Sequence, residues 1–262
     1  MINHRRLFNL FASNSKRGTF KAEGNTLFLY DVIVGTDADA EYFGGVSPQA
    51  FSKALAGLTG PVALRINSPG GDVFAARAMA QAMREYAGEI TAHVDGYAAS
   101  SASLIAVSAS KTIMAPGSFM MIHKAWTWGM GNSDDLTATA NLLAKVDGTL
   151  AETYATKSGG DAAKFSAMMA IETWFTPQEA IDAGLADEIA AETAKASALS
   201  TWNMSAFDGA PKPAAAVADP AIAAAAAAAV VAAAELAAAD DDQAEFEQRQ
   251  RAHATRMLAL TA

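Results

Sequence analysis

Between residues 26 and 192 the chain alternates short apolar runs with longer amphipathic segments, and no other feature constrains its fold as strongly. Residues 27–34 and 62–66 are apolar runs of the length that is typical of buried strands. Two helices are expected to begin at Ser47-Pro48 and Thr176-Pro177, because a capping side chain stands directly before a proline there. Strands that alternate with helices in this way predict an α/β fold.

A longer helix is expected from about residue 133 to residue 157. Its apolar residues recur every three or four positions, at Leu136, Ala140, Leu143, Val146, Leu150 and Tyr154. This spacing places them on one face of the helix, and such a face needs another surface to cover it. That surface is either the core of the same domain or a neighbouring subunit.

Composition divides the chain into three parts. Residues 1–25 are polar and basic, and we expect them to be flexible or to act as a propeptide. Residues 26–192 form the folded domain, and residues 193–262 form an alanine-rich tail. In that tail 18 of the 27 residues from 213 to 239 are alanine, which favours a helix but contributes little buried area. The tail is therefore either a solvated linker or a linker that ends in a short docking helix.

The composition also excludes several classes of protein. The chain has no cysteine, which excludes a disulfide scaffold, a thiolate zinc site and a cysteine nucleophile. A net charge of −9 argues against a nucleic-acid binder, which usually carries a basic surface. The folded part lacks the roughly 20 consecutive apolar residues of a membrane span, and Asn9 interrupts the short apolar run near the N-terminus. We expect a cytoplasmic protein without a signal peptide, metal, cofactor, membrane partner or nucleic-acid partner.

Three turns between expected elements carry residues that are capable of chemistry. Gly70-Gly71 separates a strand from a helix, so its amides either approach a ligand or only form a tight turn. Ser100 precedes a helix of small residues, where a serine is either a nucleophile or a helix cap. His123 ends an apolar run and is either a structural residue or the base that a serine hydroxyl needs.

Taken together and in this order, residues 67–71, 96–100 and 121–123 resemble three motifs of the ClpP-like serine peptidases. Residues 174–187 are similar to the segment that closes the family's domain, and the resemblance covers about residues 26–190. It implies a ClpP/crotonase-like fold of repeated β-β-α units. It also implies a serine protease domain over residues 26–192, a ring-like homo-oligomer and a reaction that needs no cofactor.

The resemblance implies a role for each matching residue. Ser100 would be the nucleophile and His123 the general base, with Ser101 and Ser103 as less well placed alternatives to Ser100. The backbone N–H groups of Gly71 and Ser101 would form the oxyanion hole.

The acidic member of the triad is the point at which this chain departs from the family's pattern. Where the family has an aspartate, this chain has Glu172, whose side chain is one methylene longer. Asp147 and Asp161 are the competing carboxylates. We expect Glu172 to orient His123.

Finer details resemble the ClpP-related head maturation proteases of tailed phages and prophages. These details are Tyr30-Asp31, residues 44–47, residues 65–74 and residues 172–176. The resemblance implies a serine endopeptidase that cleaves scaffold proteins, capsid proteins or itself inside an assembling procapsid in the host cytoplasm.

Other functions stay open from the sequence. One is a ClpP-type degradative protease with a separate unfoldase, since the chain lacks the nucleotide-binding pattern G-x-x-x-x-G-K. Others are a non-catalytic capsid scaffold on a peptidase fold and a crotonase-fold acyl-CoA enzyme. A serine–lysine dyad that used Lys111 would leave His123 without a role.

Overall fold

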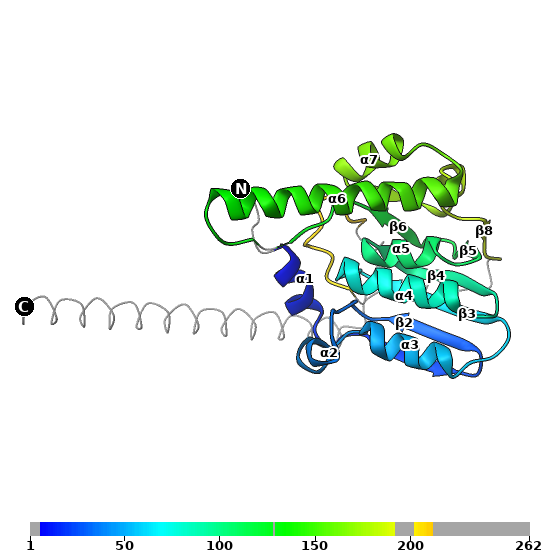
Figure 1. Cartoon of the computed structure of the whole chain (residues 1–262). Coiled ribbons are helices and arrows are strands. Elements are labelled where there is room, and N and C mark those ends of the chain that lie inside the picture. Colours follow the sequence, from blue (N-terminus) through cyan, green and yellow to red (C-terminus); the bar gives the residue numbers. More distant parts are fainter. Residues whose placement is uncertain (1–5, 128, 192–201, 212–262) are drawn as a thin grey trace, which may run out of the picture. The chain divides into compact units, whose positions relative to one another are not determined.

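A mixed sheet of eight strands forms the centre of the protein (Figure 1). The computed structural model describes residues 6–127, 129–191 and 202–211. Neighbouring strands follow the order β1-β2-β3-β4-β5-β8, while β6 pairs with β4 and with β7. The strands are β1 (Thr19–Glu23), β2 (Thr26–Tyr30), β3 (Val62–Ser68), β4 (Ile90–Ala99), β5 (Lys111–Met114), β6 (Phe119–Ile122), β7 (Thr173–Phe175) and β8 (Glu188–Ile189).

Strand β4 has two partners on the same side, one for each half of its length. Its first half pairs in parallel with β5, with Thr91 opposite Lys111. Its second half pairs in parallel with β6, with Ala99 opposite Met121. The carboxyl ends of β4 and β6 therefore lie side by side, and the segments that follow the two strands leave the sheet at the same edge.

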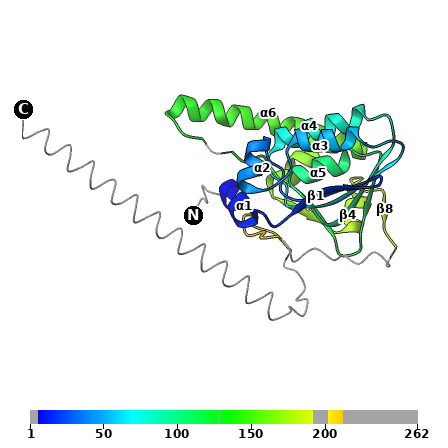
Figure 2. The same cartoon turned by 90° about the horizontal axis from the view of Figure 1, so that it is seen from below.

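Helices cover one face of this sheet. In Figure 2, α3, α4 and α5 lie on the same side of the strands, and the long helix α6 runs beside them. The helices are α1 (Arg6–Asn14), α2 (Asp37–Phe43), α3 (Pro48–Ala56), α4 (Val73–Glu85), α5 (Ser101–Val107), α6 (Ser133–Ser158), α7 (Ala162–Ala170) and α8 (Pro177–Asp182). The main core lies between the helices and the sheet. It includes the fully buried residues Phe51, Leu64, Ile66, Met79 and Ile105.

The α/β fold predicted from the sequence is confirmed, and so are the two predicted helix starts. Ser47 caps α3 and accepts a hydrogen bond from the N–H of Ala50. Thr176 and Glu179 form a capping box at the start of α8. The predicted long helix is α6, but its apolar face is covered only in part. Val146 and Leu150 are buried, whereas Leu136 is 46% exposed.

The fold begins before the boundary that we expected at residue 26. Strand β1 pairs with β2 along its whole length, from Thr19 opposite Tyr30 to Glu23 opposite Thr26. Helix α1 buries Leu10 in a second apolar cluster, together with Trp202 and Phe207. Residues 6–23 and 202–211 thus pack on the domain. The remainder of the expected tail, residues 193–201 and 212–262, lies outside the described residues.

None of the helices in the described ranges has the length and apolar character needed to cross a membrane.

Asp31 is a buried carboxyl just after β2. It is 5% exposed, and its Oδ1 accepts a hydrogen bond of 2.8 Å from the N–H of Val32. Burial raises the pKa of Asp31 from 3.8 to about 6, against the lowering effect of backbone N–H groups of Val32 and Gly45. The fold therefore favours the protonated form of this side chain.

Replacing this carboxyl by an amide should stabilise the protein at neutral pH. Asp31 stabilises the fold most below pH 3.8, and this contribution is lost as the pH rises through about 6. Such a pKa difference corresponds to roughly 3 kcal/mol. Urea denaturation at pH 4, 5 and 7 should show Asp31→Asn gaining up to about 3 kcal/mol over the wild type as the pH rises.

The exposed Asp182→Asn is the matched control, and its difference from wild type should stay within about 0.5 kcal/mol. A constant difference between Asp31→Asn and wild type from pH 4 to pH 7 would contradict the assignment.

Candidate active site

Ser100 occupies a strained turn between β4 and α5. Its backbone has φ 54° and ψ −125°, a combination that residues other than glycine seldom adopt. The N–H of Ser100 donates to the carbonyl of Met121 at 2.9 Å. Its own carbonyl accepts hydrogen bonds from both the N–H and the hydroxyl of Ser103, at 2.9 and 2.6 Å. These bonds hold the turn in a conformation that exposes the Ser100 hydroxyl at the start of a helix.

The hydroxyls of Ser103 on α5 and Tyr154 on α6 support this turn. Ser103 has one hydroxyl proton, which it donates to the carbonyl of Ser100. The bond of 2.8 Å between Ser103 Oγ and the hydroxyl of Tyr154 must therefore be donated by Tyr154. Tyr154 is fully buried, and burial raises its pKa to about 12, so the phenol keeps this proton.

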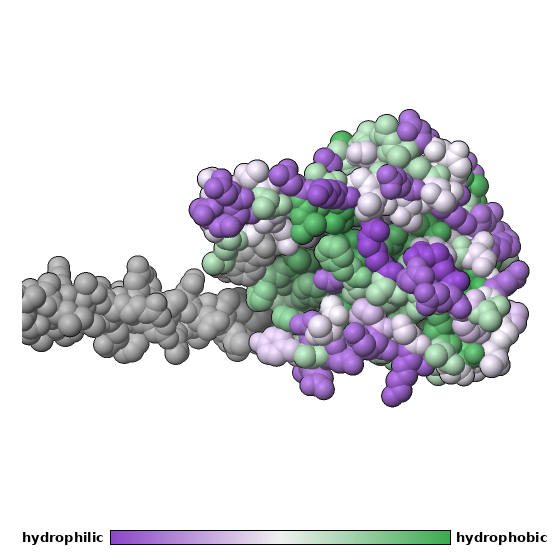
Figure 3. All heavy atoms as spheres, viewed as in Figure 1, coloured by the Kyte–Doolittle hydropathy of each residue, from purple (hydrophilic) through white to green (hydrophobic). Residues whose placement is uncertain are grey.

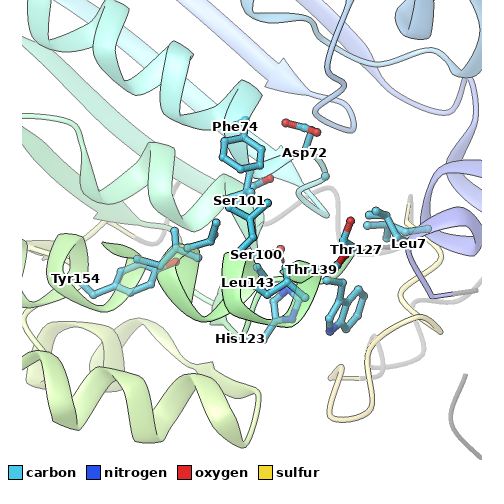
Figure 4. Close-up of a pocket in the computed structure, with 18 residues that line it drawn as sticks. Leu7, Asp72, Phe74, Ser100, Ser101, His123, Thr127, Thr139, Leu143 and Tyr154 are labelled. Carbon is cyan, nitrogen blue, oxygen red and sulfur yellow. Dashed lines mark hydrogen bonds between the residues drawn. The ribbon is translucent and has the colours of Figure 1, made fainter. Parts of the chain in front are cut away.

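His123 lies one residue beyond β6 and faces Ser100. The distance from His123 Nε2 to Ser100 Oγ is 2.7 Å, and Figure 4 shows the two side chains joined by this bond. The pairing of β6 with the second half of β4 produces the contact, because Ala99 lies opposite Met121, Ser100 follows Ala99 directly and His123 lies two residues after Met121. A neutral imidazole in this position can accept the proton of the serine hydroxyl.

Burial keeps that imidazole neutral. His123 is 9% exposed, and its pKa is lowered from 6.5 to about 3, first by burial and then by the positive charge of Arg6. Aromatic rings surround it: the ring centroids of Trp126 and Phe207 lie 4.4 and 5.6 Å from that of His123. Arg6 lies over the ring of Trp126 at 5.4 Å.

Gly71 and Ser101 border the same space as Ser100 and His123. Gly71 bridges to Ile33, but this pairing uses the carbonyl of Gly70 and the N–H of Asp72, which leaves the Gly71 N–H out of it. Gly71 has φ 148°, and a Cβ there would come within 2.0 Å of the Ile33 carbonyl oxygen, so only glycine fits. Ser101 is the first residue of α5, where an N–H has no partner within the helix.

A cavity of about 310 Å³ opens next to these groups. Gly71, Ser100, Ser101 and His123 all line it, and most of its remaining wall is apolar. The apolar wall comes from three helices, with Leu7 and Leu10 from α1, Val73 and Phe74 from α4, and Leu142, Leu143, Val146 and Leu150 from α6. Figure 3 shows hydrophobic side chains gathered beneath α6 on this face. A cavity with such a wall can take an apolar side chain beside Ser100.

The structure does not bring Glu172 to His123, contrary to our expectation. Glu172 adopts φ 53° just before β7. Its Oε1 accepts hydrogen bonds from the indole N–H of Trp174 at 3.2 Å and from the N–H of Gly209 at 2.7 Å. The left-handed backbone turns this carboxylate toward residues 202–211, where it anchors the chain.

The competing carboxylates are also engaged elsewhere. Asp147 accepts a hydrogen bond of 2.8 Å from the N–H of Ala125, and Asp161 caps α7. Within residues 6–127, 129–191 and 202–211, none of the acidic side chains is hydrogen-bonded to His123.

The alternative nucleophiles and the alternative base have other surroundings. Ser103 is held in the bond with Tyr154, and the Ser101 hydroxyl is buried without a hydrogen-bond partner. Lys111 forms an ion pair with Glu188 at the far edge of the sheet. Only Ser100 meets His123 among these candidates. In the same described part of the chain, no group of three His, Asp or Glu residues could hold a metal ion.

Comparison with known proteins points to one family. The sequence profile of the Clp protease family matches residues 37–193. The ATP-dependent Clp protease proteolytic subunit 1 of Protochlamydia amoebophila is 32% identical over 133 residues, which cover 49% of this chain and 65% of that protein. The ATP-dependent Clp protease proteolytic subunit of Bacteroides fragilis is 32% identical over 130 residues, or 49% of this chain and 63% of that protein. The corresponding subunit of Streptococcus pneumoniae is 33% identical over 137 residues, or 51% of this chain and 70% of that protein. The chain thus spans slightly less than two thirds of the first two relatives.

The buried imidazole should resist protonation in solution. Between pH 8 and pH 5 the ring resonances of His123 should stay at neutral positions, because its pKa is about 3. Imidazole NMR on the whole protein, assigned by comparison with His123→Gln, measures this directly. Arg6→Gln should raise the pKa of His123, since it removes the positive charge that lowers it. A His123 titration midpoint near 6.5 in the wild type would show that the ring is not buried.

Proposed function

Because the chain belongs to the Clp protease family, we propose that it is a serine peptidase with Ser100 as its nucleophile and His123 as its base. The observation that carries this proposal is the 2.7 Å bond between Ser100 Oγ and His123 Nε2, beside an apolar cavity. Gly71 and Ser101 line the same cavity, and their backbone N–H groups would supply the oxyanion hole. The Clp protease profile extends over most of the region in which the motifs were recognised.

Hydrolysis follows in two steps from these positions. Ser100 Oγ attacks the peptide carbonyl while His123 Nε2 takes its proton, and the new oxyanion receives hydrogen bonds from the N–H groups of Gly71 and Ser101. The C–N bond breaks when His123 returns the proton to the leaving amine, which leaves an acyl group on Ser100. Water then attacks the acyl group, His123 takes its proton, and return of that proton to Ser100 releases the carboxylic acid product.

A fluorophosphonate probe tests the nucleophile. The wild type should be labelled covalently at one residue, and Ser100→Ala should abolish labelling because it removes the attacking oxygen. His123→Gln should slow labelling by at least about a thousandfold. Intact-protein mass spectrometry measures the product and its rate.

Ser101→Ala is the matched control for Ser100→Ala, since alanine keeps the backbone N–H and removes only the neighbouring hydroxyl. It should still be labelled. Absence of labelling in the wild type would favour a non-catalytic scaffold or a crotonase-type enzyme, and labelling of Ser100→Ala would place the nucleophile elsewhere.

For the biological substrate, we favour a Clp-type degradative peptidase that acts on unfolded proteins. The relatives above are named as ATP-dependent Clp protease proteolytic subunits, so any ATP dependence here would come from a separate unfoldase, as this sequence lacks G-x-x-x-x-G-K. Assembly into a ring-like homo-oligomer fits the exposed apolar residues Met130, Leu136 and Leu142 at the free end of α6.

Head maturation is the second candidate. None of the relatives named above is called a head maturation protease, so this proposal rests on the motifs at residues 44–47, 65–74 and 172–176. One structural feature favours a specialised role. Helix α1 and residues 202–211, which adjoin the site, both lie outside the matched residues 37–193.

The pattern of cleavage separates the two candidates. Incubation with an unfolded protein of mixed sequence should give many short peptides, because the cavity offers an apolar wall as its main means of selection. Peptide mass spectrometry with Ser100→Ala as control identifies the cut sites. Cleavage at only one or two sites of a co-expressed scaffold or capsid protein, with the unfolded protein left intact, would support head maturation instead.

A further inference from the structure

We propose that Phe207 and Trp126 are positioning residues for His123, and that their rings fix the imidazole where a triad carboxylate would otherwise do so. This inference rests on the proposed function, since it assigns roles around the same catalytic base. Neither ring has any acid–base chemistry of its own. Their effect on the reaction would pass entirely through the orientation of His123.

The three rings form a corner in which the imidazole has little freedom to turn. The plane of His123 makes an angle of 66° with Trp126 and 78° with Phe207, so each contact is edge to face. Phe207 also stacks on Trp126, with 5.2 Å between centroids and 29° between planes. Edge-to-face contacts depend on ring orientation, so rotation of the imidazole away from Ser100 would disrupt both.

Phe207 is held in this position by the chain on either side of it. On one side, the indole N–H of Trp202 donates to the carbonyl of Asn67 at 3.1 Å. On the other side, the N–H of Gly209 donates to Glu172 at 2.7 Å, and Tyr97 donates its hydroxyl proton to the carbonyl of Pro211 at 3.2 Å. Residues 202–211 are thus tied to the domain at both ends, with Phe207 between the ties.

The N-terminal helix secures the same segment. Asn14 and Asn203 exchange two hydrogen bonds, of 3.0 and 2.7 Å, between side chain and backbone. Arg6 contacts both carboxylate oxygens of Asp208, at 2.9 and 2.8 Å. Arg6 also lies over Trp126, so the positioning rings are linked to the segment that carries one of them.

This arrangement gives Glu172 a role without contact to His123. Its carboxylate receives the N–H groups of Trp174 and Gly209, and the ring of Trp174 lies 6.0 Å from that of Phe207. Glu172 is therefore an anchor for the segment that carries Phe207. An anchor needs only an oxygen that accepts hydrogen bonds, whereas the acid of a triad needs a negative charge.

Removal of the Phe207 ring should slow the reaction without weakening substrate binding. With a fluorogenic peptide substrate, Phe207→Ala should lower kcat about tenfold and leave KM within about twofold, since loss of one such ring contact corresponds to a change of this order. Phe207→Tyr keeps the ring and should restore most of kcat. The matched control is Phe11→Ala, a partly buried ring of the same apolar cluster that contacts Phe43 and not His123, and it should stay near wild type.

A pH profile separates positioning from a general loss of structure. Opening the aromatic corner would hydrate His123 and weaken the burial that is the main cause of its lowered pKa. The pKa should therefore rise, so the acidic limb of kcat/KM should move from near pH 3 toward pH 6.5 in Phe207→Ala. Control Phe11→Ala should keep the wild-type profile, as should any variant that loses only overall stability.

Two substitutions of Glu172 provide a test that leaves Phe207 intact. Glu172→Gln keeps an acceptor oxygen for Gly209 and should lose at most about threefold in kcat, while Glu172→Ala should behave like Phe207→Ala. If Glu172→Gln lost a hundredfold or more, Glu172 would be the triad acid and the inference would be overturned. It would also be overturned if Phe207→Ala matched the wild type in kcat and pH profile. Failure of the proposed function is a different result, namely a wild type that is not labelled at Ser100.

Discussion

The parallel pairing of β6 with the last three residues of β4 is the contact on which the site depends. It sets Ala99 opposite Met121, and the N–H of Ser100 extends it by donating to the carbonyl of Met121. Ser100 follows Ala99 directly and His123 lies two residues after Met121. The hydroxyl of Ser100 therefore meets the imidazole of His123. A shift of this register by one residue would turn His123 to the opposite face of the sheet. Ser100 and His123 therefore owe their contact to backbone pairing, and the side chains add the final bond.

That pairing requires β4 to change partners partway along its length. Its first half lies beside β5 and its second half beside β6, and its register with β3 also shifts between Ile66 and Ser68. The irregularity would leave backbone groups unpaired in the core. Asn67 compensates at this point, because its side-chain oxygen accepts the N–H of Tyr97 at 3.1 Å. The Asn-Ser-Pro-Gly-Gly motif, residues 67–71, thus satisfies a backbone N–H where the sheet is irregular, and the same motif contains Gly71.

The sequence was informative where function depends on the ends of strands and uninformative where it depends on distant contacts. Ser100 precedes an expected helix and His123 ends an apolar run, and the motifs around them resemble those of a known family, so both could be named as candidates before the structure was known. The orientation of Glu172 could not be, because it follows from a left-handed backbone angle in a residue that is not glycine. The contact of Phe207 with His123 could not be predicted either, since Phe207 reaches the site from a segment beyond the recognised domain. Helix α1 was missed because Asn9 interrupts its apolar run, although Leu7 and Leu10 share one face of a helix.

Within the described residues no carboxylate is hydrogen-bonded to His123, and for the base that we propose this changes which charges must offset the imidazolium. Burial and Arg6 both disfavour a positive charge on His123, as its lowered pKa indicates. In the proposed reaction, however, the proton reaches His123 at the moment when a negative oxygen forms beside it. In a cavity with apolar walls the attraction between these two charges is poorly screened, and it therefore offsets part of the cost of the imidazolium. If the Gly71 and Ser101 amides fix the position of the oxyanion as we propose, they also fix the partner of the imidazolium. The proposed oxyanion hole and base would then be coupled more closely than in a triad, where a carboxylate shares that task.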